Sequence, residues 1–114
     1  MSHVAPVIDP RAVRQGLDLS YERMGRVLDV SSRTVLRMEE LGRAPRSAVV
    51  AERLAELAQI VELGELVYSP EGWQQFLTLP QPRFGGRTAL QLIERGEAQR
   101  VLGALATDYE GAAT

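Results

Sequence analysis

The stretch from residue 19 to residue 41, LSYERMGRVLDVSSRTVLRMEEL, most restricts the fold, because it contains the start and stop signals of two short helices. Ser20 and Ser31 can each accept a hydrogen bond from a free backbone N–H group at the start of a helix. Asp29 falls between the two helices, and aspartate tolerates a left-handed backbone better than most residues. The pattern predicts a helix over residues 21–28 and a second one from residue 32 to about residue 41.

The spacing of small and apolar residues in this stretch is typical of a helix-turn-helix, in which two short helices meet at a steep angle. With Tyr21 as the first position, Gly25 falls where a side chain would collide with the second helix. The apolar residues expected to face the core are Met24, Leu28, Val30, Val35 and Met38.

The other face of the second predicted helix carries residue types that contact base edges and phosphates in a DNA major groove. Glu39 and Glu40 at the end of this helix would repel phosphates, whereas Arg46 beyond it could restore contacts. A solvated helix face would carry the same arginines, so DNA binding is a hypothesis separate from the motif. The expected DNA-binding residues are Ser32, Arg33, Thr34, Arg37 and Arg43.

The rest of the chain also predicts helices, which makes the expected fold class all-α. Residues 1–46 are expected to form a helix-turn-helix bundle, residues 47–68 a long connecting helix, and residues 69–114 a small helical domain with a C-terminal tail. The buried stripe expected along the long helix consists of Val50, Leu54, Leu57, Val61 and Leu66. Shorter helices are expected over residues 11–15 and 70–77, between a capping Thr88 and Gly96, and over residues 97–107.

The composition excludes several kinds of chemistry. The chain has no cysteine, and its 13 basic residues are all arginine. Its one histidine, His3, lies in residues 1–9, ahead of the first predicted helix. A phosphate-binding or Schiff-base lysine and a cysteine nucleophile are therefore excluded. We expect no enzyme activity, metal or cofactor. The longest apolar run, residues 48–51, is far too short for a membrane span, so we expect a cytoplasmic protein with no membrane partner.

The net charge of −2 hides an asymmetry between the two halves of the chain. Residues 1–53 hold nine arginines and seven acids, a balance of +2, and residues 54–114 hold four arginines and eight acids, a balance of −4. This division indicates two surfaces with different partners.

Residues 81–111, QPRFGGRTALQLIERGEAQRVLGALATDYEG, resemble the toxin-binding domain of the Xre/MbcA/ParS antitoxin family, and the opening stretch resembles the Xre-type helix-turn-helix that precedes it there. Ala89 departs from this pattern, in which proline follows the capping residue. The elements that carry the resemblance are Pro82, Phe84, Gly85, Gly86, Thr88, Leu90, Leu92, Ile93, Gly96, Val101, Leu102, Leu105, Tyr109 and Gly111.

The resemblance implies an antitoxin that neutralises a RES-domain toxin, an enzyme acting on NAD, by placing its C-terminal end near the NAD site. It also implies a homodimer that binds operator DNA and represses its own operon. Tyr109 and its neighbours are expected beyond the last helix, on a segment free to enter a partner's cleft. The expected toxin-binding residues are Arg83, Phe84, Gly85, Gly86, Arg87, Tyr109, Glu110 and Gly111.

A second interpretation of the sequence is a stand-alone helix-turn-helix regulator whose C-terminal half only dimerises. In that case the Gly85-Gly86 pair is an ordinary loop. Trp73 and Phe76 are expected in the core under either interpretation.

Overall fold

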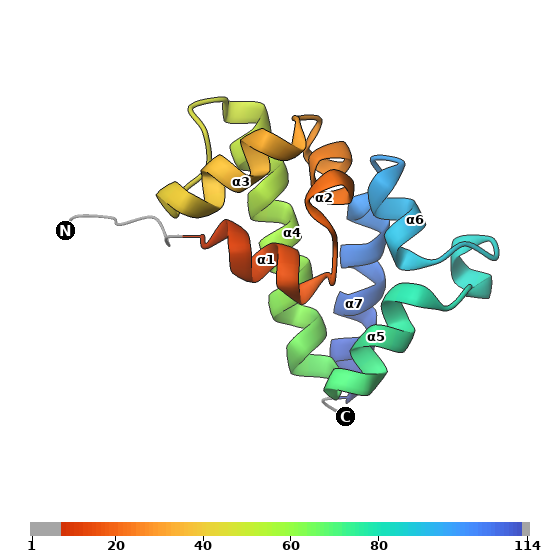
Figure 1. The fold of residues 1–114 in the computed structure, drawn as a ribbon. Helices are drawn as coiled ribbons and strands as arrows, with labels where there is room; N and C mark the ends of the chain where they lie inside the picture. Colours follow the sequence, from red (N-terminus) through yellow and green to blue (C-terminus); the bar gives the residue numbers. More distant parts are fainter. Residues whose placement is uncertain (1–7, 113–114) are drawn as a thin grey trace. The chain divides into compact units, whose positions relative to one another are not determined.

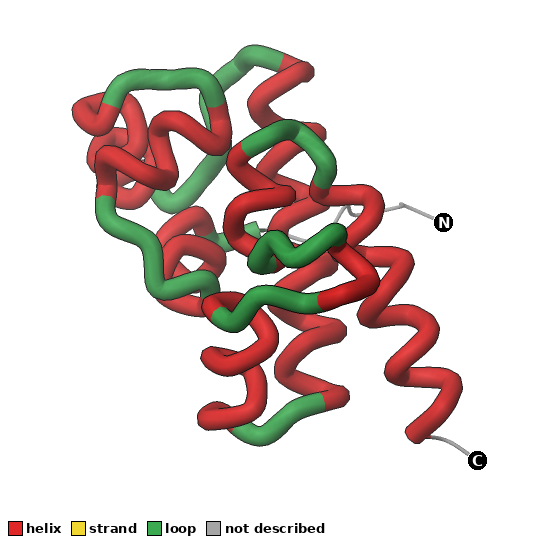
Figure 2. Tube along the Cα trace, turned by 90° about the vertical axis from the view of Figure 1, so that its right-hand side faces the viewer, coloured by secondary structure: helices red, strands yellow, loops and turns green. Residues whose placement is uncertain are grey.

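The computed structural model describes residues 8–112, which form seven α-helices and one 3-10 turn (Figure 1). This range contains no β-strand (Figure 2). Its one isolated β-bridge joins Gln81 and Arg87. The all-α prediction is confirmed; His3 lies outside the described residues. The elements are α1 (Pro10–Gly16), α2 (Tyr21–Leu28), α3 (Ser32–Leu41), α4 (Ala48–Val67), α5 (Pro70–Thr78), η1 (Pro82–Phe84), α6 (Ala89–Glu94) and α7 (Ala98–Ala112).

None of the helices between residues 8 and 112 combines the length and the apolar character that crossing a bilayer requires.

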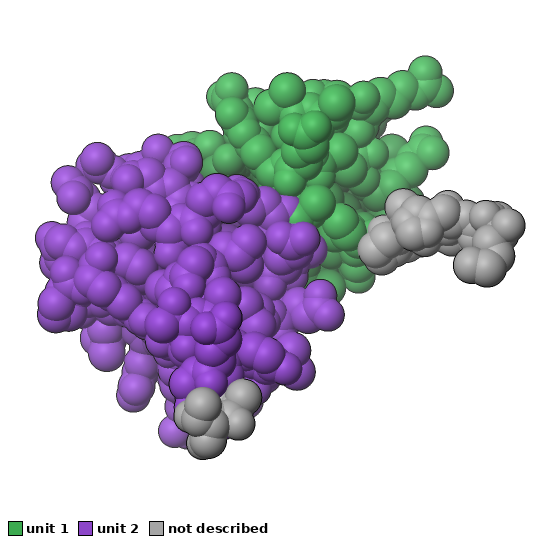
Figure 3. Space-filling model, turned by 180° about the vertical axis from the view of Figure 1, so that it is seen from behind, with its two compact units in different colours: residues 1–55 green, residues 56–114 purple. Residues whose placement is uncertain are grey.

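The chain divides into two compact units, residues 1–55 and residues 56–114 (Figure 3). The boundary falls inside α4, so the first part of this helix belongs to unit 1 and the rest to unit 2. The three segments expected from the sequence, with all of α4 as a connector, remain a prediction about domains.

In unit 1, the predicted caps of α2 and α3 are confirmed. The Ser20 hydroxyl accepts a hydrogen bond from the Arg23 N–H at 3.1 Å, and the Ser31 hydroxyl accepts one from the Thr34 N–H at 3.1 Å. Asp29 ends α2 with φ 59° and ψ 46°, in the left-handed region expected for it. These contacts fix where each helix begins and where α2 ends.

Gly25 lets the turn between α2 and α3 pass directly over α2. A Cβ atom added at Gly25 would lie 2.6 Å from the Val30 carbonyl oxygen and 3.3 Å from the Ser32 nitrogen. The predicted collision is therefore confirmed, and its main partner is the backbone of the turn. Met24, Leu28, Val35 and Met38 are buried as expected, whereas Val30 is only half-buried.

Unit 2 is built around an aromatic cluster. The Phe76 ring lies 5.5 Å from the Trp73 ring, 5.3 Å from the Tyr68 ring and 6.2 Å from the Phe84 ring, measured between centroids. Trp73, Phe76 and Phe84 are buried, which confirms the core role expected for the first two. The predicted capping box of α6 is also present, since the side chains of Thr88 and Gln91 each accept a hydrogen bond from the other residue's N–H.

Two expectations about unit 2 are wrong. Helix α7 continues to Ala112, so Tyr109, Glu110 and Gly111 belong to its last turn and not to a free segment. No proline interrupts the helix there, and Gly111 alone does not end it. Leu66 is 68% exposed, because the buried face of α4 continues at Gly64, beside Trp73, and leaves Leu66 on the other side.

Replacing Gly25 by leucine tests this account of the turn. We expect the substitution to lower the free energy of unfolding by about 1–3 kcal/mol, because backbone must move to admit the side chain. Gly103→Leu is the control, since a Cβ at Gly103 meets nothing within 4 Å. Thermal melts followed by circular dichroism give both values, and an unchanged midpoint for Gly25→Leu would reject the assigned register.

Candidate functional site

The outward face of α3 carries the side chains expected to bind DNA. Ser32, Arg33 and Arg37 are exposed, and so is Arg43 just beyond the helix. Thr34 is half-buried, and its hydroxyl lies 2.9 Å from the Ser31 hydroxyl, so it also takes part in the helix cap. The structure thus places four of the five predicted residues on α3 and the fifth just beyond its end.

The arginines of this face have no carboxylate partner within residues 8–112. Arg33, Arg37, Arg43 and Arg46 form no ion pair there, whereas five other arginines pair with Glu39, Glu97 or Asp108. Four arginines without an ion pair therefore lie close together in sequence, on α3 and in the loop after it. Such a concentration attracts phosphate anions over a range set by the ionic strength.

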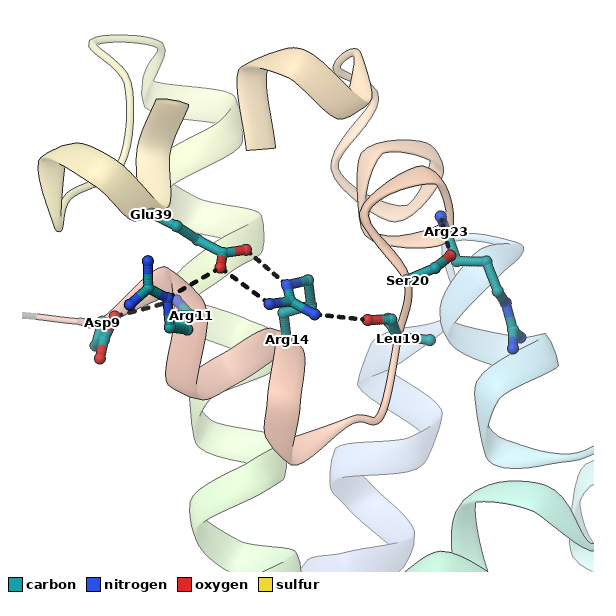
Figure 4. Close-up of polar contacts among 7 residues, drawn as sticks. All are labelled: Asp9, Arg11, Arg14, Leu19, Ser20, Arg23 and Glu39. Atoms are coloured by element: carbon teal, nitrogen blue, oxygen red, sulfur yellow. Dashed lines mark hydrogen bonds and ion pairs between the residues drawn. The ribbon is translucent and has the colours of Figure 1, made fainter. Parts of the chain in front are cut away.

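Glu39, expected to repel phosphates, points into unit 1 instead of outward. Its side chain is fully buried and accepts hydrogen bonds from Arg14 Nε at 2.6 Å, Arg14 Nη2 at 3.0 Å and Arg11 Nε at 3.3 Å (Figure 4). Hydrogen bonding to Glu39 raises the pKa of the Arg14 guanidinium. Repulsion by Glu39 is therefore ruled out, and of the two glutamates only Glu40 is exposed.

A hollow of about 220 Å³ opens beside the C-terminal half of α3. Its lining contains three arginines and four apolar residues, and no acidic residue. This combination suits a phosphate group attached to a sugar, as in the DNA backbone. The lining residues are Thr34, Arg37, Met38, Leu41, Arg43, Ala44, Pro45 and Arg46.

In unit 2, Asp108 on α7 accepts three hydrogen bonds from side chains outside its helix. Arg83 Nη1 and Nη2 each donate to one of its carboxylate oxygens at 2.8 Å, and the Tyr68 hydroxyl also donates to it. The bonds from Arg83 hold the pKa of Asp108 below its ordinary value, and burial raises the pKa of Tyr68. We call this set of three residues the Asp108 clamp.

The clamp ties together the two segments expected to bind a toxin. Arg83 precedes residues 84–87 of the loop, and Asp108 precedes residues 109–111 of α7. The Arg83 guanidinium also lies 5.5 Å from the centroids of the Phe76 and Phe84 rings. The faces of these rings attract its positive charge. Tyr68 and Asp108 were missed by sequence reasoning, because nothing in their spacing shows that they meet.

The predicted toxin-binding residues fall into two groups. Phe84 is 2% exposed and belongs to the core, and Arg83 is held by the clamp, so neither presents a free side chain. The other predicted residues are exposed, with Tyr109 at 49%. They are Gly85, Gly86, Arg87, Tyr109, Glu110 and Gly111.

The loop that carries Gly85 and Gly86 is closed by its own backbone. The Gly86 N–H donates to the Gln81 carbonyl at 2.9 Å, and the Gln81 N–H donates to the Arg87 carbonyl at 3.1 Å. Both glycines lie in the left-handed region, with φ of 67° and 83°. The loop is thus closed by backbone hydrogen bonds, and its two exposed glycines carry no side chain.

Replacing Asp108 by asparagine tests the clamp. At about pH 7 we expect a loss of about 1 kcal/mol in the free energy of unfolding, since the pair is partly exposed. Pairing lowers the pKa of Asp108, so its contribution is complete above the ordinary carboxyl pKa and is lost as the pH falls through the lower pKa of the folded state. The difference between wild type and variant should therefore shrink in acid.

Urea unfolding at a series of pH values measures that difference. Glu71→Gln is the control, because Glu71 is an exposed acid of unit 2 that forms no ion pair within residues 8–112. A difference for Asp108→Asn that stays constant down to about pH 2 would exclude the ion pair as its cause.

Comparison with known proteins gives a single kind of match. No protein-family model matches the sequence, and no curated protein matches it. Among solved structures, a chain in the crystal structure of the M. tuberculosis MbcT-MbcA toxin-antitoxin complex is 27% identical to this one, with a TM-score of 0.69. The match covers 90% of this chain and 91% of that chain.

The match extends over both units, because nine-tenths of the chain takes part in it. It agrees with the resemblance predicted independently from the motifs of residues 19–41 and 81–111. The chain is therefore similar to an MbcA-type antitoxin over nearly its whole length.

Proposed function

We propose that the protein is the antitoxin of a toxin–antitoxin pair and neutralises its toxin by binding it directly. The observation that carries the proposal is the match to a chain of a toxin–antitoxin complex, at 27% identity over 90% of this chain. The motif resemblance adds the class of partner: a RES-domain toxin that consumes NAD or transfers its ADP-ribose group. In this proposal the protein has no catalytic role of its own and acts in the cytoplasm.

Toxin binding is assigned to unit 2. The glycine loop and the last turns of α7 offer exposed backbone and side chains, and the Asp108 clamp holds these two segments in one arrangement. A surface held in place before binding loses less conformational entropy when its partner arrives. The acidic balance of residues 54–114 also suits a cationic nucleotide pocket.

Operator binding is assigned to unit 1, with α2 and α3 acting as a helix-turn-helix. The unpaired arginines of α3 support this assignment, since phosphate contacts supply much of the affinity for DNA. We further propose that the protein binds its operator as a homodimer and represses its own operon. The same arginines favour the alternative function, a stand-alone helix-turn-helix regulator, because that protein would also bind DNA.

Co-expression with the protein encoded by the adjacent gene separates the two functions. If the adjacent protein stops growth when it is expressed alone, and this chain restores growth and co-purifies with it, the antitoxin function is supported. A harmless neighbour, or one that does not co-purify, would leave the regulator as the function.

Arg33→Ala and Arg37→Ala test the separation of roles between the two units. We expect each to weaken operator binding and to lower the salt slope of the affinity by about one for each phosphate contact removed. Growth rescue should stay at the wild-type level. Fluorescence anisotropy on operator DNA at several salt concentrations measures both quantities.

Arg95→Ala is the matched control, because Arg95 is exposed in unit 2 and pairs with Glu97. It should leave operator binding unchanged. Loss of growth rescue in the folded Arg33 or Arg37 variant would contradict the assignment of toxin binding to unit 2.

A further inference from the structure

A shallow apolar hollow of about 290 Å³ lies between α4 and α7 within unit 2. Leu66 on its edge is 68% exposed, the largest exposed fraction of any large apolar side chain in residues 8–112. Single exposed leucines are ordinary on protein surfaces, but this one adjoins a cavity with an apolar lining. The lining residues are Gln59, Glu62, Leu63, Leu66 and Leu102.

Tyr109 extends this apolar surface along α7. It lies seven residues after Leu102, which places both side chains on the same face of the helix, two turns apart. The neighbouring Asp108 is held by Arg83 and Tyr68, and these bonds fix the rotation of the last turns and hence the direction of Tyr109. We call Leu63, Leu66, Leu102 and Tyr109 the α4–α7 surface.

The charged side chains of α4 and α7 in unit 2 that form no ion pair within residues 8–112 are all glutamates. Residues 54–82 contain four glutamates and no arginine. Glu62 lines the hollow, Glu65 precedes Leu66, and neither forms an ion pair with any residue in the described part of the chain. Glu110 on α7 is unpaired in the same way.

This charge argues against a second copy of the chain as the occupant. In a two-fold pairing the same patch meets itself, so the unpaired glutamates of both copies would surround one apolar centre. Like charges brought together at an interface cost free energy and disfavour that partner. A partner with an apolar side chain flanked by arginine or lysine would satisfy both the apolar centre and its acidic rim.

We propose that the α4–α7 surface is the principal contact for the toxin, and that the toxin meets it with an apolar side chain between basic residues. The inference rests on the proposed function. It adds a site that the motifs of residues 81–111 do not include, because Leu63 and Leu66 belong to α4.

The affinity of the Leu66→Ala variant for the purified protein encoded by the adjacent gene tests the α4–α7 surface. We expect the dissociation constant to rise by at least about tenfold, as for an interface side chain that dominates binding. Glu62→Arg should also weaken binding, and added salt should weaken the wild-type complex. Leu79→Ala is the control, since Leu79 is 52% exposed in unit 2 outside this hollow, and its affinity should match wild type.

Light scattering of the free chain, run on the same samples, measures its oligomeric state and so tests a second copy of the chain as the occupant. An altered oligomeric state of Leu66→Ala with unchanged partner affinity would assign the surface to a second copy and overturn the proposal. If Leu66→Ala and Glu62→Arg both bind the partner with wild-type affinity, the proposal for the α4–α7 surface is wrong, and the antitoxin function is unaffected. Failure of the wild-type chain to bind the adjacent protein would overturn both.

Discussion

The carboxylate of Asp108 joins the three segments of unit 2 that border its proposed binding surface. It receives both terminal nitrogens of Arg83 and the hydroxyl of Tyr68, and so joins the end of α4, the glycine loop and α7. The aromatic cluster around Phe76 supplies the apolar contacts beneath it, and Arg83 lies against two of those rings. A bidentate pair of this kind fixes direction as well as distance. The exposed loop and the last turns of α7 therefore form one surface.

Unit 1 uses a buried carboxylate in a different way. Glu39 forms ion pairs with Arg11 and Arg14 inside the unit, whereas the arginines on the outer face of α3 form none with the described residues. Removing a buried partner from such a pair leaves an uncompensated charge, which is costly. The pairing explains how a chain of net charge −2 can still present a cationic face. The two units thus carry net charge of opposite sign, in agreement with the proposal that they bind different partners.

Local signals in the sequence predicted most of the helices. Ser20, Ser31 and Thr88 mark helix starts through contacts within one turn, and Gly25 marks a collision between segments close in sequence. Such interactions depend on neighbouring residues, so spacing alone reveals them. The resemblance to the antitoxin family likewise rested on motifs within short stretches, and the structural match agrees with it.

The errors arose where residues far apart in the sequence meet. Glu39 looked like a surface acid because its partners lie on α1, and Tyr109 looked like part of a free tail because the anchor of α7 lies at Arg83 and Tyr68. Leu66 was expected in the core because the packing of Trp73 against Gly64 cannot be read from periodicity.

Hydrogen–deuterium exchange of the chain, alone and bound to the adjacent-gene protein, tests the central claim most directly. The account predicts slower exchange on binding in residues 59–66, 83–87 and 102–112, with α3 unchanged. Protection confined to residues 21–46, or no change anywhere in a chain that co-purifies with its partner, would contradict the assignment of toxin binding to unit 2.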